Sequence, residues 1–214
     1  MPPRVLIVPG NGCTPIEQCN WYAWLANELR ERGCEVVLTS MPDPHRARES
    51  IWLPFIRDVM KCDRDTVVVG HSSGAEAAMR LAESTEFLGM LLVSACVTDL
   101  GSTPSTAFCL SPKAFLRRRQ RAGFRVLQSS VEIRENEGQC KVDRPVWGAR
   151  CVEHGQVMVT THERWTDDRF IPASEQEQVA DGLNSEFHFI DGKDHYMTED
   201  EPLILDVLVD KLHL

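Results

Sequence analysis

The chain has 214 residues, enough for one well-buried hydrophobic core and few for two, so we expect a single domain over residues 1–214. Its hydrophobic content of 43% and charged content of 26% are ordinary for a globular protein. The net charge of −9 argues against a nucleic-acid-binding protein, because a protein that neutralises phosphates needs a basic surface.

No apolar run approaches the length of a membrane-spanning helix, and the first residues show no signal-peptide pattern. We therefore expect a cytoplasmic protein, with the nucleus as a second compartment. The eight cysteines include no Cys-x-x-Cys pair, so the sequence offers no zinc or thioredoxin-type motif. Free thiols are expected rather than a disulfide framework.

Short apolar segments alternate with amphipathic segments along the chain. In chain order, the patterns predict a strand over 4–8, a helix over 21–32, a strand over 35–38, a helix over 49–60, a strand over 66–69, a helix over 75–83, strands over 90–95 and 156–160, a helix over 174–183, a strand over 186–190 and a helix over 203–212. Strands that alternate with helices favour an α/β fold, with a mostly parallel sheet flanked by helices on both faces. In such sheets, ligands bind beyond the carboxyl ends of the strands.

The most informative motif follows the third predicted strand. There a β-branched run ends in Gly70-His71-Ser72-Ser73-Gly74, and small, helix-forming residues follow at once. A strand, a sharp turn with a serine at its apex and a helix directly behind it make up a nucleophile elbow, and this segment resembles the elbow of α/β-hydrolases. Ser72 is the candidate nucleophile, because only Ser72 has a glycine two residues away on both sides.

A serine nucleophile needs a general base and a carboxylate that orients that base. In α/β-hydrolases the acid and then the histidine follow the serine along the chain. His195 is the predicted base, because it lies late, in a turn after the last predicted strand. His71 is expected to pack beside the site, and the weaker candidates for the base are His154, His162, His188 and His213.

The acid is expected in the loop that follows the fifth predicted strand. Asp168 and Asp167 are both candidates, and an exposed loop aspartate is the ordinary alternative for either of them.

The oxyanion of the tetrahedral intermediate needs two backbone N–H donors. We expect one from Ser73 and the other from the turn after the first strand, either Asn11 or Gly12. Trp21 and Tyr22 follow this turn and are candidates for a substrate pocket, although apolar residues on a helix more often belong to the core. The turn lacks the Gly-x-Gly-x-x-Gly spacing, so a dinucleotide cofactor is not indicated.

Several longer segments share their sequence with one family. They are Val8-Pro9-Gly10-Asn11-Gly12, Trp21-Tyr22-Ala23-Trp24, Met41-Pro42-Asp43-Pro44, residues 47–55 and Gly70-His71-Ser72-Ser73-Gly74-Ala75. In these segments the chain resembles the retinoblastoma-binding protein 9 family, which are small serine hydrolases of the α/β-hydrolase superfamily. The resemblance runs from Arg4 to about Leu100 and resumes from Thr166 to His195.

The resemblance implies Ser72 as nucleophile, Asp168 as acid and His195 as base. It also implies the α/β-hydrolase fold in a compact domain, with a small cap or none, that needs no metal or cofactor. The function expected from these residues is a serine hydrolase that cleaves a small ester or amide, aminoacyl compounds included, through an acyl-enzyme.

The connection over residues 101–155 departs from this pattern, because it is much longer than connections usually are. It contains a basic run between Arg117 and Arg125 inside an acidic protein. A solvated helix face, a partly disordered insertion, a lid and a docking surface are all compatible with it. A second hypothesis is therefore an interaction protein that retains the hydrolase scaffold and binds a partner through this insertion.

The family takes its name from a Leu-x-Cys-x-Glu motif that engages the retinoblastoma pocket protein. The equivalent stretch here is Met60-Lys61-Cys62-Asp63-Arg64, which lacks both the leucine and the glutamate. A positive charge in place of the glutamate opposes that contact, so binding to the pocket protein is not expected. Small-molecule substrates, rather than nucleic acids or membranes, are the expected partners.

Overall fold

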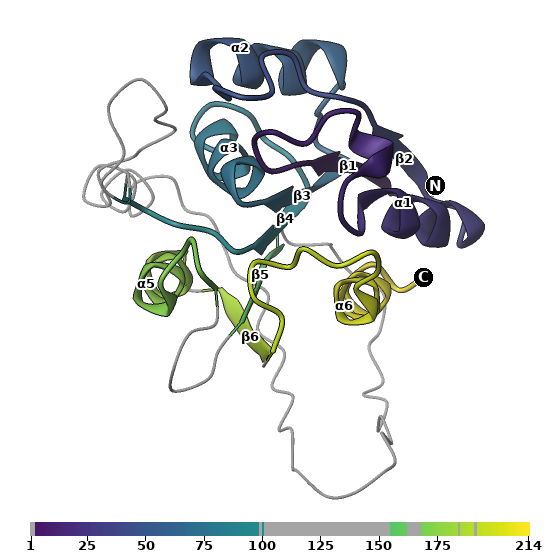
Figure 1. The fold of residues 1–214 in the computed structure, drawn as a ribbon. Coiled ribbons are helices and arrows are strands. Elements are labelled where there is room, and N and C mark those ends of the chain that lie inside the picture. Colours follow the sequence, from purple (N-terminus) through teal and green to yellow (C-terminus); the bar gives the residue numbers. More distant parts are fainter. Residues whose placement is uncertain (1–2, 99, 101–154, 162–167, 184, 191) are drawn as a thin grey trace, which may run out of the picture.

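The computed structural model describes residues 3–98, 100, 155–161, 168–183, 185–190 and 192–214. The predicted insertion therefore lies outside the described residues, apart from its last residue. Within the described ranges, parallel strands form one sheet in the order β2-β1-β3-β4-β5-β6 (Figure 1). The strands are β1 (Arg4–Val8), β2 (Glu35–Leu38), β3 (Thr66–His71), β4 (Gly89–Val93), β5 (Gly155–Thr161) and β6 (Glu186–Ile190).

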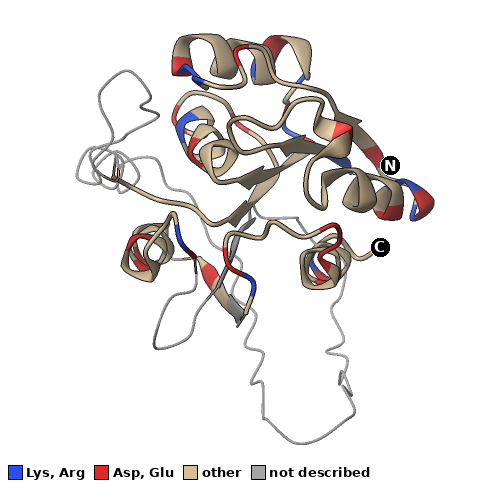
Figure 2. Cartoon of the chain, in the orientation of Figure 1, with Lys and Arg blue, Asp and Glu red and all other residues tan. Residues whose placement is uncertain are grey.

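The helices described between these strands are α1 (Tyr22–Glu31), α2 (Glu49–Pro54), α3 (Ser73–Leu81) and α5 (Ala173–Leu183), and α6 (Pro202–Leu212) follows the last strand. A short 3-10 helix, η1 (Ile16–Gln18), precedes α1. Every strand and helix that the sequence predicts is present, with bounds that differ by a few residues at most, apart from the helix expected over 49–60. Acidic and basic residues lie mainly on the helices and loops (Figure 2).

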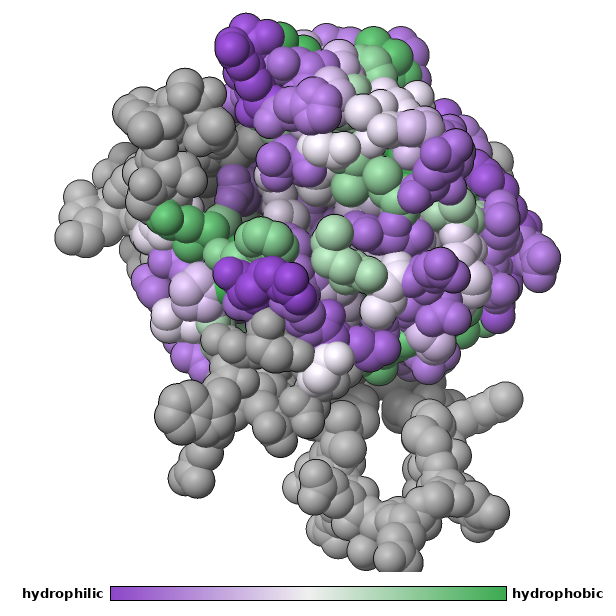
Figure 3. Space-filling view, viewed as in Figure 1, coloured by the Kyte–Doolittle hydropathy of each residue, from purple (hydrophilic) through white to green (hydrophobic). Residues whose placement is uncertain are grey.

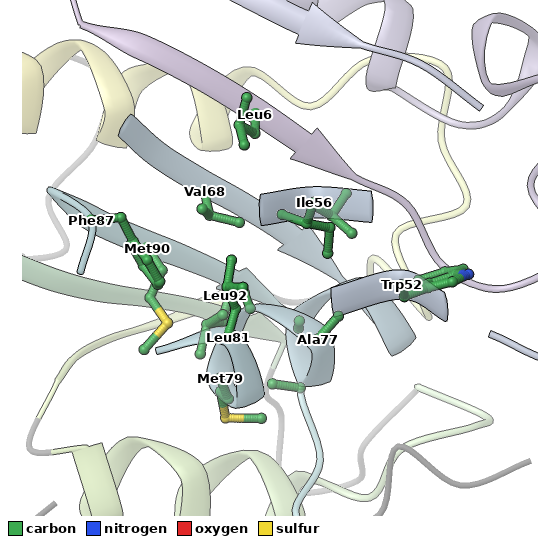
Figure 4. Packing of buried hydrophobic residues seen from close by; sticks show 14 of the residues in the cluster. Leu6, Trp52, Ile56, Val68, Ala77, Met79, Leu81, Phe87, Met90 and Leu92 are labelled. Carbon is green, nitrogen blue, oxygen red and sulfur yellow. The ribbon is translucent and has the colours of Figure 1, made fainter. Parts of the chain in front are cut away.

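The sheet separates two hydrophobic cores, because successive side chains of a strand point to opposite faces. Leu6, Val68 and Leu92 pack with residues of α2, α3 and α5, and Figure 4 shows part of this cluster. Ile7, Val69 and Leu91 pack on the other face with residues of α1 and α6. The prediction of a parallel sheet flanked on both faces is therefore confirmed.

The helix predicted over 49–60 changes its geometry in the middle. α2 ends at Pro54, and a π-helical turn, η2 (Phe55–Val59), continues from it. Pro54 has no amide hydrogen to donate to the preceding turn of an α-helix. The amide of Met60 donates to the carbonyl oxygen of Phe55 at 2.9 Å, five residues back, which closes the wider turn.

The parallel arrangement brings the ends of three central strands to one edge. Val8 is in register with Gly70, and His71 is in register with Val93, so β1, β3 and β4 end side by side. The segments that leave this edge contain the expected nucleophile and the expected oxyanion turn. Among the described residues, no helix combines the length and the apolar character needed to cross a membrane.

Candidate active site

Ser72 occupies the turn between β3 and α3, with φ of 54° and ψ of −123°. A left-handed φ costs a non-glycine residue about 1–3 kcal/mol and persists only where neighbours enforce it. The amide of Ser72 donates to the carbonyl oxygen of Val93 at 2.9 Å, and its carbonyl oxygen accepts from the amide of Ala75 at 2.8 Å. These bonds tie the elbow to β4 and to the first turn of α3.

The two glycines of the motif are required by close backbone contacts. A Cβ atom on Gly74 would lie 2.1 Å from the carbonyl oxygen of Val8, and one on Gly70 would lie 2.5 Å from the carbonyl oxygen of Gly74. Neither neighbour is a flexible side chain that could move aside. Gly70 and Gly74 therefore allow the start of α3 to lie against the ends of β1 and β3, which is the close packing that a nucleophile elbow requires.

The His195 ring is paired with the carboxylate of Asp168. Nδ1 of His195 lies 3.0 Å from Oδ1 and 2.9 Å from Oδ2 of Asp168, and the two residues are only 6% and 4% exposed. The amides of Phe170 and Ile171 each donate to Oδ1 at 2.9 Å, and the Gln176 side chain donates to Oδ2 at 3.4 Å. The structure therefore brings the predicted acid and the predicted base into direct contact.

The charge of this pair follows from its surroundings. Burial alone would raise the pKa of Asp168, but the hydrogen bond and the charge of His195, together with the amides of Ile171 and Phe170, outweigh it. The pKa of Asp168 is therefore held below its usual range, and the group is a carboxylate at neutral pH. A carboxylate at Nδ1 favours the tautomer whose Nε2 is free to accept a proton.

The turn that carries His195 has an unusual backbone. Asp194 and Tyr196, its two neighbours, have φ of 49° and 51°. Asp194 accepts a hydrogen bond from the amide of Arg169 at 3.1 Å and forms an ion pair with the guanidinium of the same residue. The Tyr196 amide donates to the carbonyl oxygen of Lys193 at 2.9 Å. These contacts attach the turn that carries His195 to the loop that follows Asp168.

The turn after β1 lies against the elbow, but only part of it fits an oxyanion hole. A Cβ atom on Gly10 would lie 3.3 Å from Cβ of Ser72, and Oδ1 of Asn11 accepts a hydrogen bond from the Ser73 hydroxyl at 2.9 Å. The Gly12 amide, however, donates to the carbonyl oxygen of Pro44 at 2.7 Å. The Gly12 alternative is therefore wrong, because its hydrogen is already used, and Asn11 is the remaining candidate.

Trp21 and Tyr22 do not line a pocket as predicted. Both side chains are fully buried, among residues of α1 and α6 and the face of the sheet that these helices cover. Neither offers surface to a substrate, so this part of the prediction is wrong. The alternative that residues on a helix belong to the core is the one that the structure supports.

His71 is hydrogen-bonded at both ring nitrogens, which the sequence did not predict. Nδ1 of His71 lies 2.6 Å from the hydroxyl of Tyr22, and Nε2 lies 2.9 Å from the carbonyl oxygen of His195. The His71 and His195 rings are 4.9 Å apart. Since Ser72 directly follows His71, this contact links the serine elbow to the turn that carries His195. The sequence indicated only that His71 packs near the site.

Two further residues of the site were missed. Gln176 on α5 contacts Asp168, and Phe170 packs edge-on against the His195 ring with centroids 5.0 Å apart. Phe170 is 57% exposed although it contacts a buried histidine. The segment Arg169-Phe170-Ile171-Pro172 carried no signal beyond its position next to the acid.

The remaining candidates are placed away from this pair or are not described. His188 lies in β6 beside Glu186, with Nε2 2.8 Å from the carboxylate, and His213 follows α6. Asp167, His154 and His162 lie outside the described residues. In the described part of the chain, no cluster of three or more histidine, cysteine, aspartate or glutamate side chains could hold a metal ion.

Comparison with known proteins gives a curated relative. The chain is 33% identical over 205 residues to serine hydrolase RBBP9 from Rattus norvegicus, covering 95% of the chain and 92% of the relative. No protein-family model matches the sequence.

Solved structures are similar at the level of the fold. The ydeN gene product from B. subtilis has a TM-score of 0.70 at 17% identity, covering 99% of this chain and all of the other (100%). Alpha/beta hydrolase domain-containing protein 10 from mouse has a TM-score of 0.57 at 14% identity, covering 98% and 90%. The type II thioesterase BorB from the borrelidin biosynthetic cluster has a TM-score of 0.59 at 15% identity, covering 99% and 93%. These similarities show the α/β-hydrolase fold.

Proposed function

From the premise that the chain belongs to the RBBP9 family of serine hydrolases, we propose that Ser72, His195 and Asp168 form a catalytic triad. The proposed reaction is hydrolysis of a small ester or amide through an acyl-enzyme. The observation that carries this proposal is the buried pairing of His195 with Asp168 next to a strained serine elbow.

Each residue has a definite task in the proposed reaction. His195 accepts the proton of the Ser72 hydroxyl through Nε2 as the serine oxygen attacks the carbonyl carbon. Asp168, ionised because its pKa is lowered, stabilises the imidazolium that results. His195 then donates this proton to the leaving group, and the acyl group remains on Ser72.

The second half of the reaction repeats these roles with water. His195 accepts a proton from a water molecule as that water attacks the acyl-enzyme. His195 then returns the proton to the Ser72 oxygen, the bond between this oxygen and the acyl carbon breaks, and the acid is released. In both halves, the oxyanion accepts hydrogen bonds from the amides of Ser73 and Asn11. Ser73 is the first residue of α3, where an amide has no partner within the helix, and the positive end of the helix dipole favours a negative charge there.

A fluorophosphonate probe tests the proposal directly, because it forms a stable adduct only with an activated serine. We expect a single adduct on the peptide that contains Ser72, no adduct in Ser72→Ala and a strongly reduced rate in His195→Ala. Ser84→Ala is the control, since it removes an exposed hydroxyl after α3. An adduct on Ser72→Ala protein, or loss of the adduct in Ser84→Ala, contradicts the assignment.

A further inference from the structure

We propose that His71 is a positioning residue whose neutral ring, protonated at Nε2, holds the backbone of His195 and so fixes the base relative to Ser72. This role rests on the proposed function of Ser72 and His195. It differs from the role of the triad residues, because His71 acts on the base through a backbone carbonyl and takes no proton from the substrate.

The other partners of the Tyr22 hydroxyl determine whether it donates its hydrogen to His71 or accepts one from it. The Tyr22 hydroxyl oxygen accepts from the amide of Gly10 at 3.1 Å and from the side-chain amide of Asn20 at 3.3 Å. A hydroxyl oxygen has two acceptor positions and one hydrogen to donate. Its hydrogen can then go to Nδ1 of His71 at 2.6 Å or to the sulfur of Cys13 at 3.8 Å, and the much shorter distance assigns it to His71.

The other end of the ring leads to the same tautomer. Nε2 of His71 lies 2.9 Å from the carbonyl oxygen of His195, and a carbonyl oxygen only accepts hydrogen bonds. Nε2 must therefore carry the hydrogen, and in a neutral ring Nδ1 is then the acceptor. Both ends of the His71 ring require the same arrangement, although their partners are far apart in the chain.

The surroundings keep His71 neutral. Burial, and then the nearby His195, lower the pKa of His71 to about 3, although its hydrogen bond to the His195 carbonyl and the charge of Asp168 oppose this change. The groups that face the ring are Tyr22, His195 and, at longer range, Asp168. A neutral ring is what catalysis needs here, because His195 becomes positively charged 4.9 Å away when it accepts the serine proton.

The turn that carries His195 has a strained backbone, which neighbouring contacts must hold in place. The left-handed backbone of Asp194 and Tyr196 on either side of His195 persists only where contacts enforce it. His71 is the last residue of β3 and is in register with Val93, so its backbone is fixed by the sheet. The bond to the carbonyl of His195 therefore joins this strained turn to the residue that precedes the nucleophile.

The activity test compares two substitutions of His71. His71→Leu removes both ring nitrogens, whereas His71→Gln keeps an N–H donor that reaches the position of Nε2. We expect kcat of His71→Leu to fall about 100-fold with KM nearly unchanged, as for a displaced catalytic group. His71→Gln should retain a kcat about tenfold higher than His71→Leu, since it restores one hydrogen bond. His213→Asn, an exposed histidine after α6, is the control for loss of an imidazole.

Nitrogen NMR of the ring tests the tautomer that the positioning role requires. We expect the His71 proton on Nε2 throughout about pH 5 to 8, and also in Tyr22→Phe, because the carbonyl oxygen of His195 still requires a donor there. A proton on Nδ1 in the unaltered protein, or a His71 ring that titrates in this range, overturns the proposal. Because it uses the unaltered protein, this measurement can overturn the proposal even if His71→Leu does not fold.

The outcomes separate this proposal from the proposed function. Fluorophosphonate labelling of Ser72 in the unaltered protein tests the triad, whatever the behaviour of His71. Labelled protein together with an unchanged kcat in folded His71→Leu contradicts the positioning role alone. Failure to label Ser72 contradicts the proposed function, and with it the positioning role that rests on that function.

Discussion

The carbonyl oxygen of Val8 lies 2.1 Å from the position that a Cβ atom would take on Gly74. This approach explains why α3 can begin directly over the end of β1 and so place Ser72 at the edge of the sheet. We expect Gly74→Ala to lower the free energy of unfolding by about 3 kcal/mol, because rigid backbone must move to make room. Urea denaturation measures the difference.

Gly33→Ala is the matched control for this substitution. Gly33 has φ of 87°, but no atom lies within 4 Å of the position that an added methyl group would take, so only the backbone conformation is unfavourable there. We expect it to cost about 1–2 kcal/mol. Equal losses in the two variants would show that close contact is not the reason for Gly74.

Replacement of Asp168 by asparagine tests how the acid controls the base. Oδ1 of Asp168 accepts hydrogen bonds from the amides of Phe170 and Ile171, so the oxygen of an asparagine is held there. Its NH₂ group then takes the place of Oδ2, which lies 2.9 Å from Nδ1 of His195. An NH₂ group requires Nδ1 of His195 to accept, which puts the ring proton on Nε2 and prevents it from acting as a base. We expect kcat to fall about 10⁴-fold in Asp168→Asn, the size of effect expected for the wrong tautomer.

The measurement is the steady-state rate on an activated ester, with thermal unfolding to show that the protein is folded. Asp65→Asn removes a carboxylate from an exposed position before β3 and should leave the rate unchanged. A rate in Asp168→Asn within about tenfold of the unaltered enzyme would exclude this role for the acid.

The parts of the site that the sequence predicted are those with local signatures. The elbow around Ser72 depends on a strand, two glycines and a helix that are adjacent in the chain, so the sequence pattern was sufficient. The order of acid and base along the chain was enough to select His195 and to include Asp168 among two candidates.

The parts that could not be predicted depend on contacts between distant segments. The loss of Gly12 as a donor results from Pro44, and the burial of Tyr22 results from packing beside α6 and from its bond to His71. Gly12 lies in the turn after β1 and Tyr22 begins the first α-helix after it, so their order in the chain suggested a role at the site. Only the three-dimensional structure shows that the Gly12 amide and the Tyr22 hydroxyl already have hydrogen-bond partners.

Glu76 on α3 predicts a pH dependence of stability. Its carboxylate accepts a hydrogen bond from the thiol of Cys96, and burial raises its pKa from 4.5 to about 7. Between these values the folded protein holds a proton that the unfolded chain has released, so the contribution of Glu76 to stability is lost as the pH rises from about 4.5 to about 7.

Glu76→Gln removes this titration. We therefore expect the stability of Glu76→Gln relative to the unaltered protein to increase as the pH rises through this range. His71, whose lowered pKa has the opposite effect on stability, is present in both proteins and cancels in the difference. Unfolding midpoints at several pH values give the measurement, and Glu17→Gln, at an exposed position in η1, controls for the loss of one charge. A difference that is constant with pH would contradict the prediction.

Phe170 predicts a preference for apolar substrates. Few large apolar side chains are exposed among the described residues, and hydrophilic residues occupy much of the face in Figure 3. Phe170 is 57% exposed while the edge of its ring contacts His195, so it borders the place where a substrate meets the base. An acyl or alkyl group that covers this ring would bury apolar area on both partners.

We expect Phe170→Ala to lower kcat/KM about tenfold for a hexanoate ester and less than about threefold for the acetate, since only the longer chain reaches the ring. Val59→Ala is the control: Val59 is 61% exposed but lies near Lys61, whose carbonyl oxygen accepts from Arg4 at the opposite edge of the sheet. Equal losses for both esters in Phe170→Ala would mean that the ring supports His195 rather than contacting the substrate. A loss confined to the longer ester assigns Phe170 to substrate binding, since a displaced base would slow both reactions alike.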